Sequence, residues 1–402
     1  MLVGLDVLRR GRNHPIRRRM QDARIALLTH SAAVDEWGAS TLSVMRALQM
    51  NVTTVFSPEH GLDGVAQAEE SVGTDDAQVG ELKLLSLYGR DKASLTPKRE
   101  DLQDVDLLVI DLVDVGARYY TYVWTALLAT RAAIEAGVHV VVLDRPNPLS
   151  GNSLYLEGRP QQPEFCSFVG LRPLPTRHCM TLAEILVFVL TEEDQVLGKD
   201  GALSVISCEG WERNRLADAW GRPFVPPSPN MPSLQTALVY PGGCLLEGTN
   251  LSEGRGTTLP FQSIGAPYLP ANRLAEALGE VPGAWIRPTR FRPTFDKHQG
   301  QVCSGITLHV TDPHRFLPIA TYLRIIHAAK QIAPDAFQFL DRVYEFESEI
   351  PAFDLLTGSE QARQLLNENA PVADLISQVS PVDEEWVTRV ETAEDLVSEL
   401  EL

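Results

Sequence analysis

One carboxylate stands in a sequence frame that suits acid–base chemistry. Glu59 lies within Ser-Pro-Glu-His-Gly at 57–61, where a proline and a glycine bracket the turn. A carboxyl group held in a rigid, partly buried frame can deliver a proton to a substrate. The same five residues could equally form an ordinary turn that carries a surface carboxylate. The motif alone leaves both interpretations open.

The segment 111–120 combines two carboxylates, an arginine and two tyrosines. Asp111 and Asp114 could cap the turn that follows them, an interpretation that we favour for at least one of the two. Arg118 and Tyr119 could begin a packed helix, or they could form a subsite for a sugar or a carboxylate.

Two further segments offer polar side chains in rigid surroundings. Asp144 and Arg145 could neutralise each other as an ion pair, and Asn147 stands between two prolines, which suits a hydrogen-bond donor to a ligand. His178 precedes Thr-Leu-Ala-Glu at 181–184, a capping box that predicts the start of a helix. His178 could therefore be a histidine packed at that helix start.

The segment 246–258 is the most unusual in the chain. It is spaced by glycines and holds, within thirteen residues, two carboxylates, an amide, an arginine and four hydroxyls: Glu247, Thr249, Asn250, Ser252, Glu253, Arg255, Thr257 and Thr258. A solvated loop is the plain alternative, but this set of side chains predicts a binding or catalytic loop.

Several kinds of chemistry lack their motifs in this chain. It contains no GxGxxG, GxxxxGK[ST], HExxH, CxxC or GxSxG pattern, which argues against nicotinamide, phosphate-cradle, zinc and acyl-transfer chemistry. Asp, Glu, Arg, Asn, Tyr and Trp remain, and these are the residue types that bind and cleave carbohydrates. We therefore expect neither a metal nor a cofactor.

Alternating strands and helices must position these segments. Strands are predicted at 24–29, 52–56, 82–87, 105–111, 138–143 and 202–208, and helices at 41–50, 123–136 and 181–193. Near-continuous apolar strands in β-α order predict an α/β fold with a doubly wound parallel sheet. Polar segments follow four of the strands, at 29–31, 57–61, 111–120 and 143–148. They should converge on one rim, because ligands of such sheets bind beyond the carboxyl ends of the strands.

A proline-rich stretch at 222–232 cannot form regular structure and predicts a domain boundary. The predicted domains are 1–232 and 233–402, the second a smaller α+β unit that completes the active-site cleft. We expect its strands at 236–240 and 304–310 and its helices at 315–330 and 360–368.

Charge and composition restrict the partners. With 35 Lys and Arg against 53 Asp and Glu, the net charge is −18, which makes nucleic acid an unfavourable partner. The acidic residues of the tail predict a solvated helix face. Five scattered cysteines indicate free thiols in a reducing compartment. The sequence shows neither a leader nor a membrane-spanning stretch, so we expect a cytoplasmic protein, or a periplasmic or secreted one if a leader has been removed.

Longer motifs show a resemblance to a known family. They lie at 57–61, 114–122, 143–148, 167–170, 227–232 and 247–257. The chain resembles, nearly end to end, the exo-β-N-acetylmuramidase family, a group of peptidoglycan exo-hexosaminidases formerly known as a domain of unknown function. The resemblance implies a Rossmann-like domain, a smaller C-terminal domain and an active site between them. It also implies a glycoside hydrolase that releases N-acetylmuramic acid from the non-reducing end of peptidoglycan fragments, in cell-wall turnover or recycling.

The resemblance makes Glu59 the first candidate for the catalytic acid. We expect the second carboxylate to be Glu253, Glu247 or Asp144, in that order. Muramic acid carries a lactyl carboxylate, which one or more arginines would bind. The full set expected to bind substrate is His60, Arg118, Tyr119, Arg145, Asn147, His178, Asn230, Asn250 and Arg255.

The chain departs from the family pattern after the Glu-His-Gly motif. It has Leu-Asp-Gly at 62–64 and Ala-Glu-Glu at 68–70, where the family usually carries an arginine and later Ala-Gly-Glu. It also has Cys179 in place of a glycine. These departures leave open a saccharide-binding protein without turnover. A separate alternative is a metal-assisted hydrolase that uses Glu59, His60, Asp144 and His178.

Overall fold

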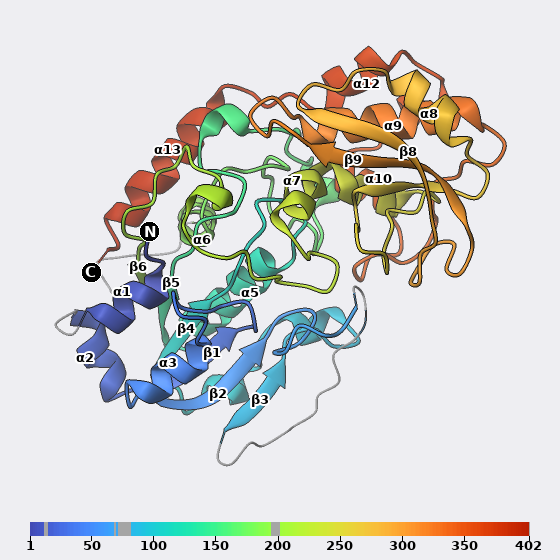
Figure 1. Cartoon of the computed structure of the whole chain (residues 1–402). Helices are drawn as coiled ribbons and strands as arrows, with labels where there is room; N and C mark the ends of the chain where they lie inside the picture. Colours follow the sequence, from blue (N-terminus) through green and yellow to red (C-terminus); the bar gives the residue numbers. More distant parts are fainter. Residues whose placement is uncertain (12–14, 68–69, 71–81, 194–201, 402) are drawn as a thin grey trace.

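Six parallel strands form the central sheet of the first domain (Figure 1). The computed structural model describes residues 1–11, 15–67, 70, 82–193 and 202–401. The strand order is β3-β2-β1-β4-β5-β6, which confirms the predicted doubly wound α/β fold. The strands are β1 Arg24–Thr29, β2 Asn51–Ser57, β3 Lys83–Ser86, β4 Leu107–Asp111, β5 His139–Leu143 and β6 Leu203–Ile206.

Helices cover both faces of this sheet, so successive strand residues are buried in different cores. In β1, Ile25 and Leu27 pack into one core and Ala26 and Leu28 into the other. The first core includes side chains of α1 Gly4–Arg10, α2 Pro15–Gln21 and α3 Thr41–Ala47, and the second those of α4 Arg99–Leu102, α5 Tyr122–Glu135 and α6 Leu182–Glu192. Burial on two faces explains why these strands are apolar throughout rather than alternating.

A three-stranded antiparallel sheet and a group of helices form the second domain. The strand order is β7-β9-β8, with β7 Ser263–Ala266, β8 Ala284–Phe291 and β9 Cys303–Val310. Its helices are α7 Leu234–Gly243, α8 Ala271–Leu278, α9 Pro318–Ile332, α10 Ala352–Thr357, α11 Gln361–Asn367 and α12 Val372–Val379. Helix α9 lies against α7, α8 and α12.

The strand predicted at 236–240 is wrong, because these residues belong to helix α7. The hydroxyl of Ser233 accepts a hydrogen bond from the backbone N–H of Thr236 at 3.3 Å and caps the helix start. Pro241 lies in the last turn of the helix. A short apolar run rich in β-branched residues does not distinguish a buried strand from a buried helix. The capping serine is the local feature that favours the helix.

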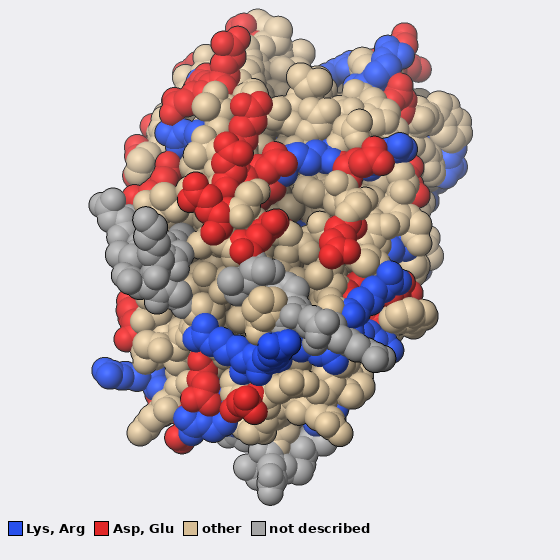
Figure 2. Space-filling model, turned by 90° about the vertical axis from the view of Figure 1, so that its left-hand side faces the viewer, with Lys and Arg blue, Asp and Glu red and all other residues tan. Residues whose placement is uncertain are grey.

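The last helix, α13 Glu385–Ser398, returns to the first domain and lies against α6. Its apolar side chains, Trp386 and Val390 among them, are buried, while its acidic residues are exposed. Figure 2 shows acidic side chains gathered on this side of the molecule. The prediction of a solvated acidic helix face in the tail is confirmed.

None of the helices in the described part of the chain has the length and apolar character needed to cross a membrane.

Short 3₁₀ helices complete the fold: η1 Lys92–Leu95, η2 Ser153–Tyr155, η3 Pro163–Phe165, η4 Ala217–Ala219 and η5 Cys244–Gly248.

Candidate active site

A pocket of about 440 Å³ lies between the two domains and is lined by side chains from both. The first domain contributes the rim beyond β2 and the loop after β4, and the second contributes α7, η5 and two loops. The lining residues are Glu59, His60, Tyr119, Tyr120, Thr121, Val169, Ser228, Asn230, Met231, Tyr240, Glu247, Arg255, Phe261, Tyr344 and Glu345. The pocket thus combines three carboxylates, one arginine and several aromatic rings.

Glu59 follows strand β2 and is held by contacts on both its side chain and its backbone. Its Oε2 accepts a hydrogen bond from the Thr121 hydroxyl at 2.7 Å, and its carbonyl accepts one from the Tyr122 hydroxyl at 3.0 Å. The next residue, His60, has a φ of +70°, which turns the chain sharply after the carboxylate. Only 5% of Glu59 is exposed. It is therefore a rigid, nearly buried carboxyl group that faces a cavity, as a general acid requires.

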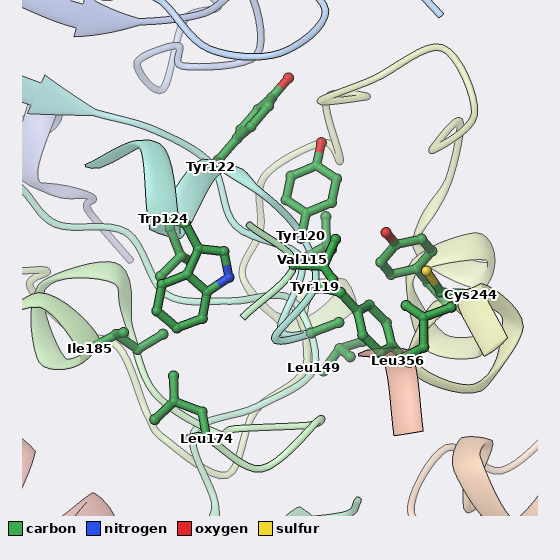
Figure 3. Packing of buried hydrophobic residues seen from close by; sticks show 14 of the residues in the cluster. Val115, Tyr119, Tyr120, Tyr122, Trp124, Leu149, Leu174, Ile185, Cys244 and Leu356 are labelled. Atoms are coloured by element: carbon green, nitrogen blue, oxygen red, sulfur yellow. The ribbon is translucent and has the colours of Figure 1, made fainter. Parts of the chain in front are cut away.

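The tyrosines of segment 119–122 form the packed floor next to Glu59. Tyr119 donates a hydrogen bond to the carbonyl of Pro241 in helix α7 and so joins the two domains. Figure 3 shows Tyr119 and Tyr120 on the loop that leads into helix α5 and Tyr122 at the start of that helix, while Trp124 is turned toward Leu174. Burial raises the pKa of Tyr119, Tyr120 and Tyr122. Their hydroxyls therefore stay protonated at neutral pH and act as hydrogen-bonding groups rather than as charges.

A compact charge network forms the opposite wall. Arg255 binds Glu253 through Nε at 2.9 Å and Glu247 through Nη2. Glu247 also accepts a hydrogen bond from the Tyr344 hydroxyl at 2.6 Å, and Lys297 Nζ lies 2.8 Å from Glu253 Oε2. The glycine-spaced segment therefore folds into a paired network of opposite charges rather than a solvated loop.

The three candidates for the second carboxylate lie in different surroundings. Glu247 lines the pocket, whereas Glu253 lies behind the wall and is not part of the lining. Burial alone would raise the pKa of Glu253, but the charges of Lys297 and Arg255 outweigh it and lower that pKa. Glu253 is thus held as an anion that balances two cations.

Asp144 is placed away from this pocket. Its Oδ1 accepts a hydrogen bond from the backbone N–H of Ala183 at 3.0 Å, in the first turn of α6. Burial raises its pKa to about 7. Thr181 and Glu184 form the predicted capping box at the same helix start. Asp144 thus binds the N-terminal end of helix α6.

His178 and Asp114 form a second buried pair outside the pocket. His178 Nδ1 accepts a hydrogen bond from the N–H of Met180 at 3.1 Å, and its Nε2 lies 3.2 Å from Asp114 Oδ2. Asp144 and His178 therefore do not join Glu59 and His60 in one cluster. Within the described residues, no group of three His, Cys, Asp or Glu side chains is arranged to hold a metal ion.

Of the three arginines expected to bind the substrate, Arg255 lines the pocket. Arg118 is fully buried and donates to the carbonyls of Leu174 and Leu356, at 3.1 and 2.7 Å. Arg145 forms a buried ion pair with Asp111. Arg118 and Arg145 thus both bind protein groups, and Arg118 connects the two domains through its bond to Leu356.

Of the three asparagines expected to bind the substrate, one also lines the pocket and two bind protein groups. Asn230 lines the pocket and donates to Gln67 Oε1 at 2.9 Å. Asn147 binds the backbone around Leu149, and Asn250 donates to the carbonyl of Ala336 at 2.8 Å. Two of the three amides are therefore used to hold loops.

Arg145 lines a second pocket of about 560 Å³, beyond the ends of β1, β4 and β5. Valine, alanine, proline and aromatic side chains dominate it, and no carboxylate stands among the described residues that line it. A pocket without an acid or a base does not suit hydrolysis, so the pocket between the domains is the candidate active site.

Several residues of the pocket were missed from the sequence. They are Tyr120, Thr121, Val169, Ser228, Met231, Tyr240, Phe261, Tyr344 and Glu345. The Tyr-Glu-Phe-Glu run at 344–347 has no feature that distinguishes it from an ordinary surface segment, so only the fold reveals it. One of the positions that depart from the family pattern, Glu69, lies outside the described residues.

Comparisons with known proteins cover nearly the whole chain. The models of the N-terminal and C-terminal domains of the exo-beta-N-acetylmuramidase NamZ match residues 25–235 and 238–393. The chain is 39% identical, over 364 residues, to the peptidoglycan beta-N-acetylmuramidase NamZ of Bacillus subtilis (strain 168). That alignment covers 90% of this chain and 84% of the relative.

Two solved structures share the fold. One DUF1343 family protein from Bacteroides fragilis NCTC 9343 superimposes with a TM-score of 0.81 and 26% identity, covering 99% of this chain and 98% of its own. A second protein of that family, from the same organism, has a TM-score of 0.70 at 23% identity, with 100% and 98% covered. The two-domain architecture is thus common to this chain and both structures.

Proposed function

Because this chain belongs to the exo-beta-N-acetylmuramidase NamZ family, we propose that it hydrolyses the bond that links a terminal N-acetylmuramic acid to the rest of a peptidoglycan fragment. The observation that carries the proposal is Glu59, a nearly buried carboxyl bonded to Thr121 in a pocket between the domains. The substrate is a small molecule, a muramic-acid-terminated disaccharide or muropeptide.

Glu59 acts as the general acid. It gives its proton to the glycosidic oxygen as the bond to the sugar breaks, and positive charge develops on the sugar ring. Thr121 fixes the orientation of the carboxyl group through Oε2. The aromatic rings of Tyr120, Tyr240 and Phe261 line the same pocket and offer flat apolar faces to the sugar.

Arg255 is the cation that we assign to the lactyl carboxylate of muramic acid. Its Nε and Nη2 bind Glu253 and Glu247, while Nη1 has no hydrogen-bond partner among the described residues and could meet an anion. Asn230, at the pocket edge, would hold a sugar hydroxyl or the acetamido group.

We assign the reaction to cytoplasmic recycling of wall fragments. Five free cysteines support a reducing compartment. Cell fractionation with an antibody to the chain tests this assignment, and recovery of the protein outside the cytoplasm would refute it.

The Glu59→Gln variant tests the proposed acid. The wild-type protein should release N-acetylmuramic acid from a muropeptide disaccharide, and mass spectrometry measures this release. The variant should release it about 10²–10⁴-fold more slowly. The loss should be much smaller with a nitrophenyl muramoside, because nitrophenolate leaves without a proton.

The matched control is Glu135→Gln, at an exposed glutamate that ends helix α5. It should keep wild-type activity and the wild-type thermal melt. Equal losses on both substrates would contradict the acid role. A wild-type protein that binds the disaccharide without cleaving it would favour a saccharide-binding function instead.

A further inference from the structure

The charges that line the pocket between the domains do not by themselves favour an anionic substrate. Among the described residues of the lining, the carboxylates are Glu59, Glu247 and Glu345, and the cation is Arg255. Arg255 already binds Glu247, and muramic acid would bring one more negative charge. Water screens charges little in so buried a site. A second cation close to Arg255 would therefore help to hold the substrate.

Lys297 is such a cation, and it lies behind the pocket wall. Its Nζ is 2.8 Å from Oε2 of Glu253, whose Oε1 accepts a hydrogen bond from Nε of Arg255 at 2.9 Å. Glu253 is 1% exposed and the side chain of Lys297 is 8% exposed. Lys297 is not part of the pocket lining. Its charge can therefore act on a bound ligand only through Glu253 and Arg255.

The backbone around Lys297 holds its ammonium group in place. Nζ donates to the carbonyls of Leu246 and Thr249, at 2.7 and 3.1 Å. The residues on either side of the lysine, Asp296 and His298, both have a φ of +57°. Such left-handed conformations are uncommon for residues other than glycine, and they persist where surrounding contacts hold them.

Those contacts join the loop 294–298 to the segment that carries Arg255. The His298 ring binds the carbonyl of Asn250 through Nε2 at 2.7 Å, and the Thr294 hydroxyl donates to the carbonyl of Gly256 at 2.8 Å. Gly256 has a φ of +71°, and a Cβ there would lie 2.2 Å from the Thr294 hydroxyl oxygen. The two segments are thus closely packed, with Lys297 between their outer contacts.

The wall is neutral only while Lys297 is present. Glu247 and Glu253 are balanced by Arg255 and Lys297, through three ion pairs. Burial alone would raise the pKa of Glu253, but the charges of Lys297 and Arg255 lower it, so both cations keep this carboxyl ionised. Without Lys297, Arg255 alone would face two buried carboxylates, and the wall would repel an anion.

We propose that Lys297 is a specificity-determining residue, which balances Glu253 and so lets Arg255 bind the carboxylate of the substrate; this inference rests on the proposed function. Lys297 is a positioning residue rather than a catalytic one, since it acts through Glu253 and Arg255.

A pair of substrates tests the proposal: a nitrophenyl muramoside with a free lactyl carboxylate, and its lactyl amide, which has nearly the same shape without the charge. The ratio of kcat/KM for the acid to kcat/KM for the amide measures selection of the negative charge. A general loss of fold or of chemistry lowers both values and leaves this ratio unchanged. The wild-type protein should prefer the acid.

Lys297→Met should lower the ratio by at least about tenfold, because one unit of negative charge is left uncompensated at short range. The change should come from a higher KM for the acid, with kcat nearly unchanged. Lys297→Arg keeps the charge and should keep most of the ratio. The matched control is Lys98→Met, at an exposed lysine of the first domain, which should keep the wild-type ratio and thermal melt.

Glu253→Gln removes the opposite charge and should raise the ratio. The double variant Lys297→Met/Glu253→Gln removes both charges and should return the ratio toward the wild-type value. Opposite shifts from two paired residues, cancelled in the double variant, are not expected of a purely structural pair. If Lys297→Met does not fold, Glu253→Gln and the double variant decide the question.

The outcomes separate the two proposals. A folded Lys297→Met protein with a ratio within about twofold of wild type, or a Glu253→Gln protein whose ratio does not rise, would overturn the role of Lys297 and leave the proposed function standing. A wild-type ratio near one would do the same. A wild-type protein that cleaves neither substrate would overturn the proposed function itself.

Discussion

Two parts of the same strand-end rim are put to different uses. Beyond β1, β4 and β5, Asp111 binds Arg145 and Thr41, and Asp114 pairs with His178. Beyond β2, Glu59 faces a pocket that the second domain closes. Polar residues at strand ends therefore do not by themselves mark a binding site. Where the protein supplies a partner for each charge, the cluster stabilises the fold, and ligands bind where a second domain leaves a cavity.

Because Arg145 pairs with Asp111 away from the pocket, we expect Arg145→Met to lower the free energy of unfolding rather than the catalytic rate. The substitution leaves the buried Asp111 carboxylate without its cation, which should cost about 3–5 kcal/mol. Urea unfolding measures this loss. The protein that remains folded should turn over muropeptides at nearly the wild-type rate. A large fall in kcat with unchanged stability would instead place Arg145 in the active site.

Asp144→Asn should change the pH dependence of stability. Burial raises the folded pKa of Asp144 to about 7, above the value near 3.9 in the unfolded chain. The folded state therefore favours the protonated form, and this contribution to stability is complete below about pH 4 and is lost as pH rises through 7. The asparagine has no such titration, although its amide oxygen can still accept the Ala183 N–H.

Relative to wild type, Asp144→Asn should accordingly gain stability as the pH rises from about 4 to about 7, by up to about 4 kcal/mol at about 1.36 kcal/mol per pKa unit. Urea melts at several pH values measure the difference, and activity at pH 6 should change little. Parallel stability curves for the two proteins would show that Asp144 does not titrate in this window.

Thr121→Val, on the part of the rim that faces the pocket, should give the smallest effect. It removes the hydroxyl that donates to Glu59 at 2.7 Å. A buried hydrogen bond to a carboxyl group is worth about 1–3 kcal/mol, so the rate on a muropeptide should fall by about 5–150-fold.

Thr121→Ser, which restores the hydroxyl, is the control and should recover most of that rate. Thermal melts should show both variants folded. If the valine variant loses stability but not rate, Thr121 belongs with the structural pairs of the rim rather than with the active site.

The strands of the first domain could be predicted because local pattern and burial agree there. Residues 24–29 form β1 as expected, since a strand covered on both faces is apolar at every position. At 236–240 the same kind of pattern gave a wrong strand, because the run is too short to show a helical period.

The sheet of the first domain, the family and Glu59 as the candidate acid could all be predicted from the sequence, since each depends on patterns between near neighbours or on long motifs. Which polar residues reach the pocket depends on the tertiary structure. Arg118 and Arg145 resemble ligand-binding arginines in the sequence but bind protein oxygens. Glu345 has no local signal in the sequence, yet it lines the pocket and accepts a hydrogen bond from the Tyr88 hydroxyl at 2.9 Å. A charge finds its partner through distances in space, which spacing along the chain does not encode.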